Sequence, residues 1–125
     1  MFYLEDKNEV IKQYTLSGYT LEQVKAKVWQ RQWDDKYIMP TLAYIEVTTE
    51  LRGLGLAKRL LIKVMKENKF LLFQNNNNSF WEKLSYDKQL PFVVLLHGDT
   101  WGELVYLKTC SGNIHYYSQP SWRNR

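Results

Sequence analysis

The stretch Tyr44-Ile-Glu-Val-Thr-Thr-Glu-Leu-Arg-Gly-Leu-Gly-Leu-Ala-Lys-Arg-Leu-Leu61 predicts a strand, a glycine-containing turn and an amphipathic helix in immediate succession. Gly53 and Gly55 allow the backbone to turn sharply and allow a ligand to approach it closely. The first amides of the following helix have no intrahelical acceptor, so they can donate hydrogen bonds to an anion. The stretch therefore predicts a phosphate-binding loop between a strand and a helix.

The spacing of this loop excludes two common nucleotide-binding motifs. A Walker A motif requires Gly-Lys-Ser/Thr after a glycine and a four-residue spacer, and a dinucleotide-binding fingerprint requires three glycines. The residues present instead, Arg52-x-x-Gly55-x-Ala57, resemble the R/Q-x-x-G-x-G/A signature of the GNAT acyltransferase superfamily. A second segment, Phe80-Trp81-Glu82-Lys83-Leu84-Ser85-Tyr86, resembles the F-Y-E-K-L-G-F segment of that family. The two motifs follow one another in the order that the family has.

The resemblance implies a fold class and a domain organisation. It implies an α/β protein with a mixed, mostly antiparallel central sheet and flanking helices, built around a GNAT-like acyl-CoA-binding core. Residues 1–125 are expected to form one small or truncated GNAT-like domain, with core motifs at about 41–86 and C-terminal strands at about 91–118. Two central strands of this fold splay apart, and the resemblance implies that the acyl-pantetheine arm lies in the gap.

The resemblance also implies a cofactor, which is acetyl-CoA or a related acyl-CoA. The residues that would bind it are Val47, Thr49, Arg52, Gly53, Leu54, Gly55, Leu56, Ala57, Lys58 and Asn77. The loop amides would bind the pyrophosphate, Lys58 would add positive charge, and the backbone amide of Val47 would be the catalytic oxyanion donor. Asn77 departs from the family, which has Ala at that position. No spacing of Cys and His residues predicts a metal site.

Glu46 is the candidate general base, because it is the carboxylate nearest to the loop in its strand. Partial enclosure by apolar strands would raise its pKa, whereas strand alternation leaves a solvated position equally open. Glu50 in the loop is the weaker candidate. Trp81 stands where many family members carry a tyrosine, and an indole N–H does not donate a proton as a phenol does. The chain is therefore either an enzyme without a dedicated acid or a catalytically reduced CoA-binding protein.

The hydrophobic periodicity and the turn signals predict the remaining elements. These are a hairpin over 2–16, a helix over about 21–33 with a capping box at Thr20 and Gln23, strands over 42–47 and 70–73, a helix from the glycine loop to about 68, a helix over about 80–85, and strands over 92–97, 104–109 and 114–117. The residues from Pro120 onwards show no periodicity.

The composition and net charge limit the cellular compartment and the classes of binding partner that we expect. The 125-residue chain has a net charge of +4 and a pI near 9.1, which suits an anionic ligand. A nucleic-acid partner stays open, although no nucleic-acid-binding motif accompanies the charge. The single Cys110 and the lack of an apolar run of membrane-spanning length predict a cytoplasmic protein with no membrane partner. His97 and His115 are interpreted as structural, because no nucleophile stands at a recognisable spacing from either.

The resemblance implies an N-acetyltransferase that moves an acetyl group from acetyl-CoA to an amine by direct attack in a ternary complex. The acceptor, either a small molecule or a lysine or N-terminus of a protein, is not specified by the sequence. Two alternatives remain open: a CoA-binding or interaction protein without catalysis, and a nucleic-acid-directed protein. Release of free CoA in the presence of amines separates the enzyme from the CoA-binding protein. Retention on DNA or RNA that weakens steeply with salt, and that survives loss of the CoA site, would favour the nucleic-acid-directed protein.

Overall fold

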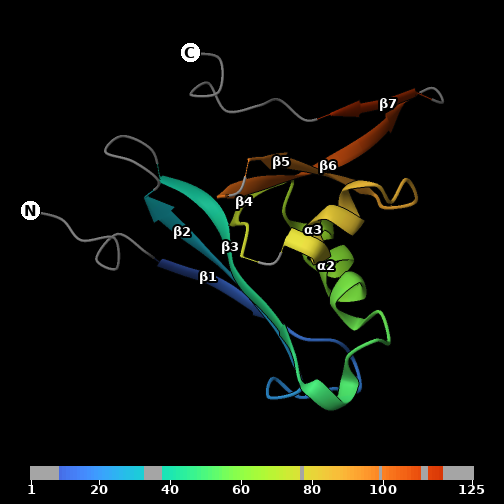
Figure 1. Ribbon diagram of the computed structural model, residues 1–125. Coiled ribbons are helices and arrows are strands. Elements are labelled where there is room, and N and C mark those ends of the chain that lie inside the picture. The colour runs from blue at the N-terminus through green and yellow to red at the C-terminus, as the bar shows by residue number, and fades with distance from the viewer. Residues whose placement is uncertain (1–8, 33–37, 77, 99, 111–112, 117–125) are drawn as a thin grey trace, which may run out of the picture.

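A computed structural model describes residues 9–32, 38–76, 78–98, 100–110 and 113–116 (Figure 1). The elements are β1 (Glu9–Tyr14), β2 (Val24–Gln32), β3 (Ile38–Val47), a 3-10 turn (Thr49–Leu51), α2 (Leu56–Glu67), β4 (Phe70–Gln74), α3 (Asn78–Ser85), β5 (Phe92–His97), β6 (Trp101–Cys110) and β7 (Asn113–Tyr116). Neither of the two described α-helices has the length and hydropathy of a membrane-spanning helix.

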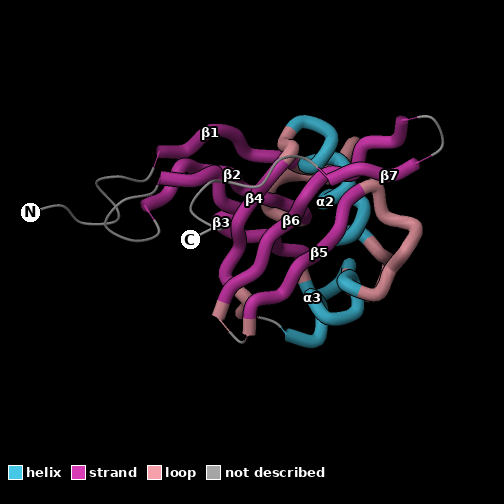
Figure 2. The backbone as a smooth tube through the Cα atoms, turned by 90° about the horizontal axis from the view of Figure 1, so that it is seen from above, coloured by secondary structure: helices cyan, strands magenta, loops and turns pink. Residues whose placement is uncertain are grey.

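The strands form a mixed, mostly antiparallel sheet in the order β1-β2-β3-β4-β6-β5. Among the described strands, only the pair β3 and β4 is parallel, and β7 extends the sheet by pairing with the far end of β6. Both helices lie on the same side of the sheet, as the views in Figures 1 and 2 agree. The predicted fold class, an α/β protein with a mixed sheet and flanking helices, is confirmed.

Helix α2 supplies much of the core. Its buried residues recur three and four positions apart and pack against β2, β3 and β6: Leu56, Leu60, Leu61, Val64 and Met65. The helix ends at Asn68, whose side chain donates a hydrogen bond to the Val64 carbonyl at 2.8 Å. The sequence predicted this helix and its end correctly, because both depend on local signals.

The helix predicted over 21–33 is wrong, because this segment contains strand β2. The side chain of Gln23 does accept a hydrogen bond from the Thr20 amide at 2.9 Å, as in a capping box, but the contact closes a turn and no helix follows. Val24, Ala26 and Val28 are all fully buried, which is the two-residue period of a strand. Pairing with β1 on one side and β3 on the other fixes the segment as a strand.

The other predicted strands are confirmed, with small shifts of their ends. The second arm of the hairpin predicted over 2–16 is β1, which pairs with β2, and the first arm lies outside the described residues. The predicted strand over 92–97 matches β5, and the next strand starts three residues earlier than predicted, at Trp101. The tail from Pro120 also lies outside the described residues.

Candidate cofactor cleft

Strands β3 and β4 separate soon after they meet. Their parallel pairing covers only Thr41 opposite Leu72 and Leu42 opposite Phe73, whereas β3 continues to Val47. A cleft of about 1210 Å³ opens at this point. Its walls come from β2, β3, the loop 48–55, the start of α2, the end of β4 and α3. The expected gap between two central strands is therefore present.

The backbone of Val47 faces this gap. Hydrogen-bonded and non-hydrogen-bonded pairs alternate along an antiparallel ladder. The Thr48 amide donates to the Gln23 carbonyl at 2.9 Å, so Val47, which lies opposite Val24, belongs to a non-hydrogen-bonded pair. Its amide consequently points away from β2, towards the side where β4 no longer pairs with β3.

The glycine loop presents backbone donors to the same cleft. Gly53 and Gly55 have φ of 85° and 75°, which is the left-handed region that favours glycine. The first intrahelical bond of α2 runs from the Arg59 amide to the Gly55 carbonyl, so the amides of 56–58 have no acceptor within the described part of the chain. A Cβ at either glycine would meet no atom within 4 Å. An anion therefore has both donors and open space here.

Arg52 braces the loop. Its Nε donates a hydrogen bond to the Val47 carbonyl at 3.1 Å, which ties the loop back to the end of β3. The guanidinium lines the cleft, and one of its N–H groups is used in this hydrogen bond. The residue that was expected to bind the cofactor therefore also positions the Val47 peptide.

Lys58 lies at the cleft but is held by an acidic residue. Its Nζ forms an ion pair with Asp87 at 2.5 Å, and Asp87 lies just beyond α3. The pKa of Asp87 is lowered below its ordinary value of 3.8, chiefly by this hydrogen bond and next by one from the Gln89 amide. The expected charge of Lys58 towards a phosphate is consequently offset by Asp87.

Glu46 lines the cleft, and of the two positions left open for it, enclosed or solvated, the structure has the solvated one. Its side chain is 59% exposed and forms an ion pair with Lys25 at 3.4 Å, on the sheet face that lies away from α2. Strand pairing places Glu46 opposite Lys25, on the exposed face of the sheet and not in the core. Glu50, in the 3-10 turn, also lines the cleft and is exposed.

The other predicted cofactor residues divide into three groups. Gly53, Gly55, Leu56 and Ala57 line the cleft. Thr49 lines it too, and it is the first residue of the 3-10 turn after β3, so it is not part of the strand. Leu54 is 62% exposed and does not line the cleft, and Asn77 lies outside the described residues.

Trp81 forms part of the cleft wall and of the core. It is 4% exposed, stacks on Phe73 with ring centroids 3.9 Å apart, and meets Phe80 edge to face at 4.9 Å. This packing explains the aromatic residue without any proton transfer. A dedicated acid is therefore not identified at this position.

His97 has a buried partner that the sequence did not reveal. Its Nε2 lies 2.5 Å from a carboxylate oxygen of Glu103, which is fully buried, and its ring stacks on Trp101 with centroids 4.3 Å apart. The two residues come from paired strands β5 and β6. The structural role predicted for His97 stays a prediction, and the side chain of His115 lies outside the described part.

Sequence reasoning missed the wall of the cleft that β2 contributes. Lys25, Trp29 and Arg31 line it together with Tyr44 of β3. The signal was the alternation of apolar and basic residues after residue 23, which the helix prediction obscured. Comparison of the chain with models of protein families, with curated proteins and with solved structures gives no match.

Proposed function

We propose that this protein is an acyl-CoA-dependent N-acyltransferase that moves an acetyl group from acetyl-CoA to an amine by direct attack in a ternary complex. The observation that carries the proposal is the meeting of two features in one cleft. The amide of Val47 faces the gap between β3 and β4, and the unpaired amides of residues 56–58, after the glycine loop, lie at the same cleft. A GNAT-type core is expected to need both.

The fit of a CoA-type cofactor is supported by the chemistry of the donors. A helix N-terminus with unpaired amides and two glycines without steric neighbours suits a pyrophosphate. The aromatic wall of Phe73, Phe80 and Trp81 suits the apolar parts of the pantetheine arm. When it is bound, the cofactor supplies an activated thioester.

The residues of the chain then have separate tasks in the transfer. A new C–N bond forms as the C–S bond breaks, and the Val47 amide donates to the carbonyl oxygen as negative charge develops there. Glu46 accepts the proton that the attacking amine loses, either directly or through one water molecule. The departing thiolate takes its proton from water, because no acid is identified. We place this activity in the cytoplasm, where the single cysteine would stay reduced.

Ligand-induced stabilisation and thiol release test the proposal together. Acetyl-CoA at a hundredfold excess over its Kd should stabilise the fold by roughly 2.7 kcal/mol, and desulfo-CoA should do nearly as well. Mixing the protein with acetyl-CoA and simple amines should release free CoA thiol. If neither ligand raises the melting temperature at millimolar concentration, the cofactor assignment is wrong. Stabilisation without thiol release would favour the CoA-binding protein without catalysis.

The role of Glu46 has its own test. Glu46→Gln should keep the affinity for acetyl-CoA and lower the transfer rate on the order of a hundredfold, the typical contribution of a positioned base. Glu22→Gln is the matched control, because Glu22 is another exposed carboxylate of the cleft. Full activity in Glu46→Gln would mean that water, and not Glu46, accepts the proton of the amine.

A further inference from the structure

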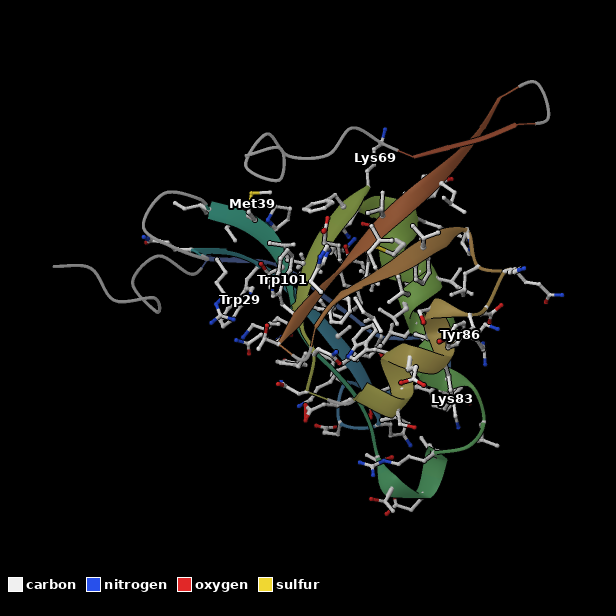
Figure 3. All side chains as sticks on the ribbon, turned by 45° about the horizontal axis from the view of Figure 1, so that its top comes forward. Trp29, Met39, Lys69, Lys83, Tyr86 and Trp101 are labelled. Atoms are coloured by element: carbon white, nitrogen blue, oxygen red, sulfur yellow. The ribbon has the colours of Figure 1, made fainter. Side chains whose placement is uncertain are left out.

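Helix α3 turns one side towards the cleft. Lys83 lies four residues after Ser79 and three after Phe80, so the three residues share one side of the helix, and all of them line the cleft. Trp81 and Leu84 are buried in the core, and their packing fixes this orientation of α3. In Figure 3, Lys83 lies below α3, on the side of the loop that follows β3. Lys83 is therefore held at the cleft by the packing of its own helix.

An ion pair joins the end of the α3 region to the start of α2. The Tyr86 amide donates to the Lys83 carbonyl at 3.3 Å, so a turn leads directly from α3 to Asp87. Asp87 in turn binds Lys58, in the first turn of α2, at 2.5 Å. The amides of residues 56–58, which have no acceptor within the described part of the chain, belong to that same turn of α2. Lys83 and these amides therefore lie on adjoining walls of the cleft.

The charge of Lys83 is not compensated by an ion pair with any described residue. The adjacent Glu82 is exposed and does not line the cleft. The carboxylates that do line it within the described part of the chain are Glu22, Glu46 and Glu50. None of them forms an ion pair with Lys83. The ammonium of Lys83 can thus bind an anion, whereas the ammonium of Lys58 already has a carboxylate acceptor.

We infer that Lys83 binds a phosphate group of the cofactor, next to the amides at the start of α2. The inference rests on the proposed acyltransferase function and names a residue that discriminates among its thioester donors. CoA carries a diphosphate and also a 3′-phosphate on its ribose, so the amides of residues 56–58 can bind one phosphate while another remains for Lys83. A contact between an ammonium and a phosphate is a charge-assisted hydrogen bond. The protein consequently prefers the complete CoA thioester over a thioester without phosphate groups.

Three acetyl thioesters test this inference: acetyl-CoA, acetyl-3′-dephospho-CoA, and acetylpantetheine, which has no phosphate. Isothermal titration gives the Kd of the first two, and thiol release with an amine gives kcat/KM for all three. Lys83→Gln should raise the Kd of acetyl-CoA about tenfold at low salt, the effect of one hydrogen bond with a charged group. Added salt should reduce this difference, because Lys83 is exposed. Acetylpantetheine should react equally well with the parent protein and with Lys83→Gln.

Acetyl-3′-dephospho-CoA identifies the phosphate that Lys83 contacts. If the contact is with the 3′-phosphate, this ligand should bind the parent protein and Lys83→Gln equally. If the contact is with the diphosphate, the tenfold difference should persist with this ligand and disappear only with acetylpantetheine. The comparison is a double-mutant cycle in which one of the two changes is made in the ligand.

Two further variants separate the contact from a general effect of charge. Lys83→Arg should bind acetyl-CoA within about twofold of the parent protein, because a guanidinium also binds phosphate. Lys88→Gln is the matched control and should bind unchanged, since Lys88 is an exposed lysine of the turn after α3 that does not line the cleft. In Lys83→Gln, KM for acetyl-CoA should rise while kcat stays unchanged, because the contact is present both before and during the transfer.

Several results would overturn the inference. An unchanged Kd of acetyl-CoA in Lys83→Gln at low salt, or an equal loss in Lys88→Gln, would reject Lys83 as the phosphate ligand while the acyltransferase proposal stands. A loss of kcat/KM in Lys83→Gln that is as large with acetylpantetheine as with acetyl-CoA would reject the phosphate as its partner. If the parent protein binds neither CoA thioester, the proposed function fails, and the inference fails with it.

Discussion

The two halves of the sheet differ in how completely their strands pair. Strand β4 pairs with β6 through five successive residues and β6 pairs with β5 through six, whereas β3 and β4 share only two pairs before they separate. In the closed half, β4-β6-β5, the pairing runs along the strands without such a break. The open half leaves strand backbone facing a cleft. The difference separates the part of the sheet that stabilises the fold from the part that is available to a ligand.

Two glycines show the same contrast. A Cβ at Gly102 in β6 would lie 2.4 Å from Cζ of Phe73 and 2.7 Å from the Leu95 carbonyl oxygen. A Cβ at Gly55 would meet nothing within 4 Å. Glycine is needed at 102 because the closed half has no room, and at 55 because the open half requires a positive φ and an approachable backbone.

The largest expected effect is in the closed half. Gly102→Ala should lower the free energy of unfolding by about 3 kcal/mol, because the new methyl group meets backbone that cannot move cheaply. Urea denaturation measures this loss. Acetyl-CoA should still raise the melting temperature of this variant, although from a lower starting value. A change of less than about 0.5 kcal/mol would mean that the closed half can move to make room for the methyl group, against what its strand pairing indicates.

The next effect is in the open half and concerns binding. Gly55→Val should weaken acetyl-CoA binding roughly a hundredfold, since a branched side chain occupies the space for the phosphate and strains the positive φ. Isothermal titration gives the Kd. Gly18→Val is the matched control, because Gly18 also has a positive φ, of 89°, and open surroundings but does not line the cleft. Unchanged affinity in Gly55→Val would remove the phosphate-loop argument.

Two strand carboxylates sharpen the contrast further. Glu103→Gln should destabilise the protein by about 2 kcal/mol, because the change disturbs the hydrogen bond that the fully buried Glu103 makes with His97. Glu46→Gln should change the unfolding free energy by less than about 0.5 kcal/mol, since Glu46 is exposed. Thermal denaturation of both variants measures the two effects. Equal losses would contradict the division between a stabilising and a functional half.

The smallest effect concerns Lys58 at the rim of the cleft. Asp87→Asn releases Lys58 from its ion pair, so Lys58 can interact with a phosphate of acetyl-CoA. Binding should tighten about threefold at low salt, because an exposed ion pair contributes little energy. Lys58→Gln should not tighten it. Weaker binding in Asp87→Asn would show that Asp87 orients Lys58 for the ligand.

The same pair predicts a pH dependence. Lys58 lowers the pKa of Asp87 in the folded state, so the pair stabilises the fold above the ordinary pKa of 3.8. This contribution is lost as the pH falls through the lower pKa of the folded state. The difference in melting temperature between the parent protein and Asp87→Asn should therefore become smaller as the pH is lowered from about 4. A difference that is constant with pH would contradict the ion pair.

The sequence by itself determined the central segment from the core strand to α3. The end of β3 at Val47, the start of α2 after Gly55 and its end near Asn68 follow from apolar periodicity, glycine conformation and capping, which all act over a few residues. For the same reason the glycine loop of the candidate site could be located without a structure. Local signals agree with the final fold in this segment.

Only the tertiary structure decided the identity of β2 and the pairing of charges. Val24 and Val28 share one face in a helix and also in a strand, because four residues are close to one helical turn and are two strand repeats. Pairing with β1 and β3 resolved the ambiguity, and it brought Lys25 to Glu46. The partners Lys58 and Asp87, and His97 and Glu103, likewise come from different elements. Such contacts depend on how elements pack together, and no short-range pattern in the sequence encodes that packing.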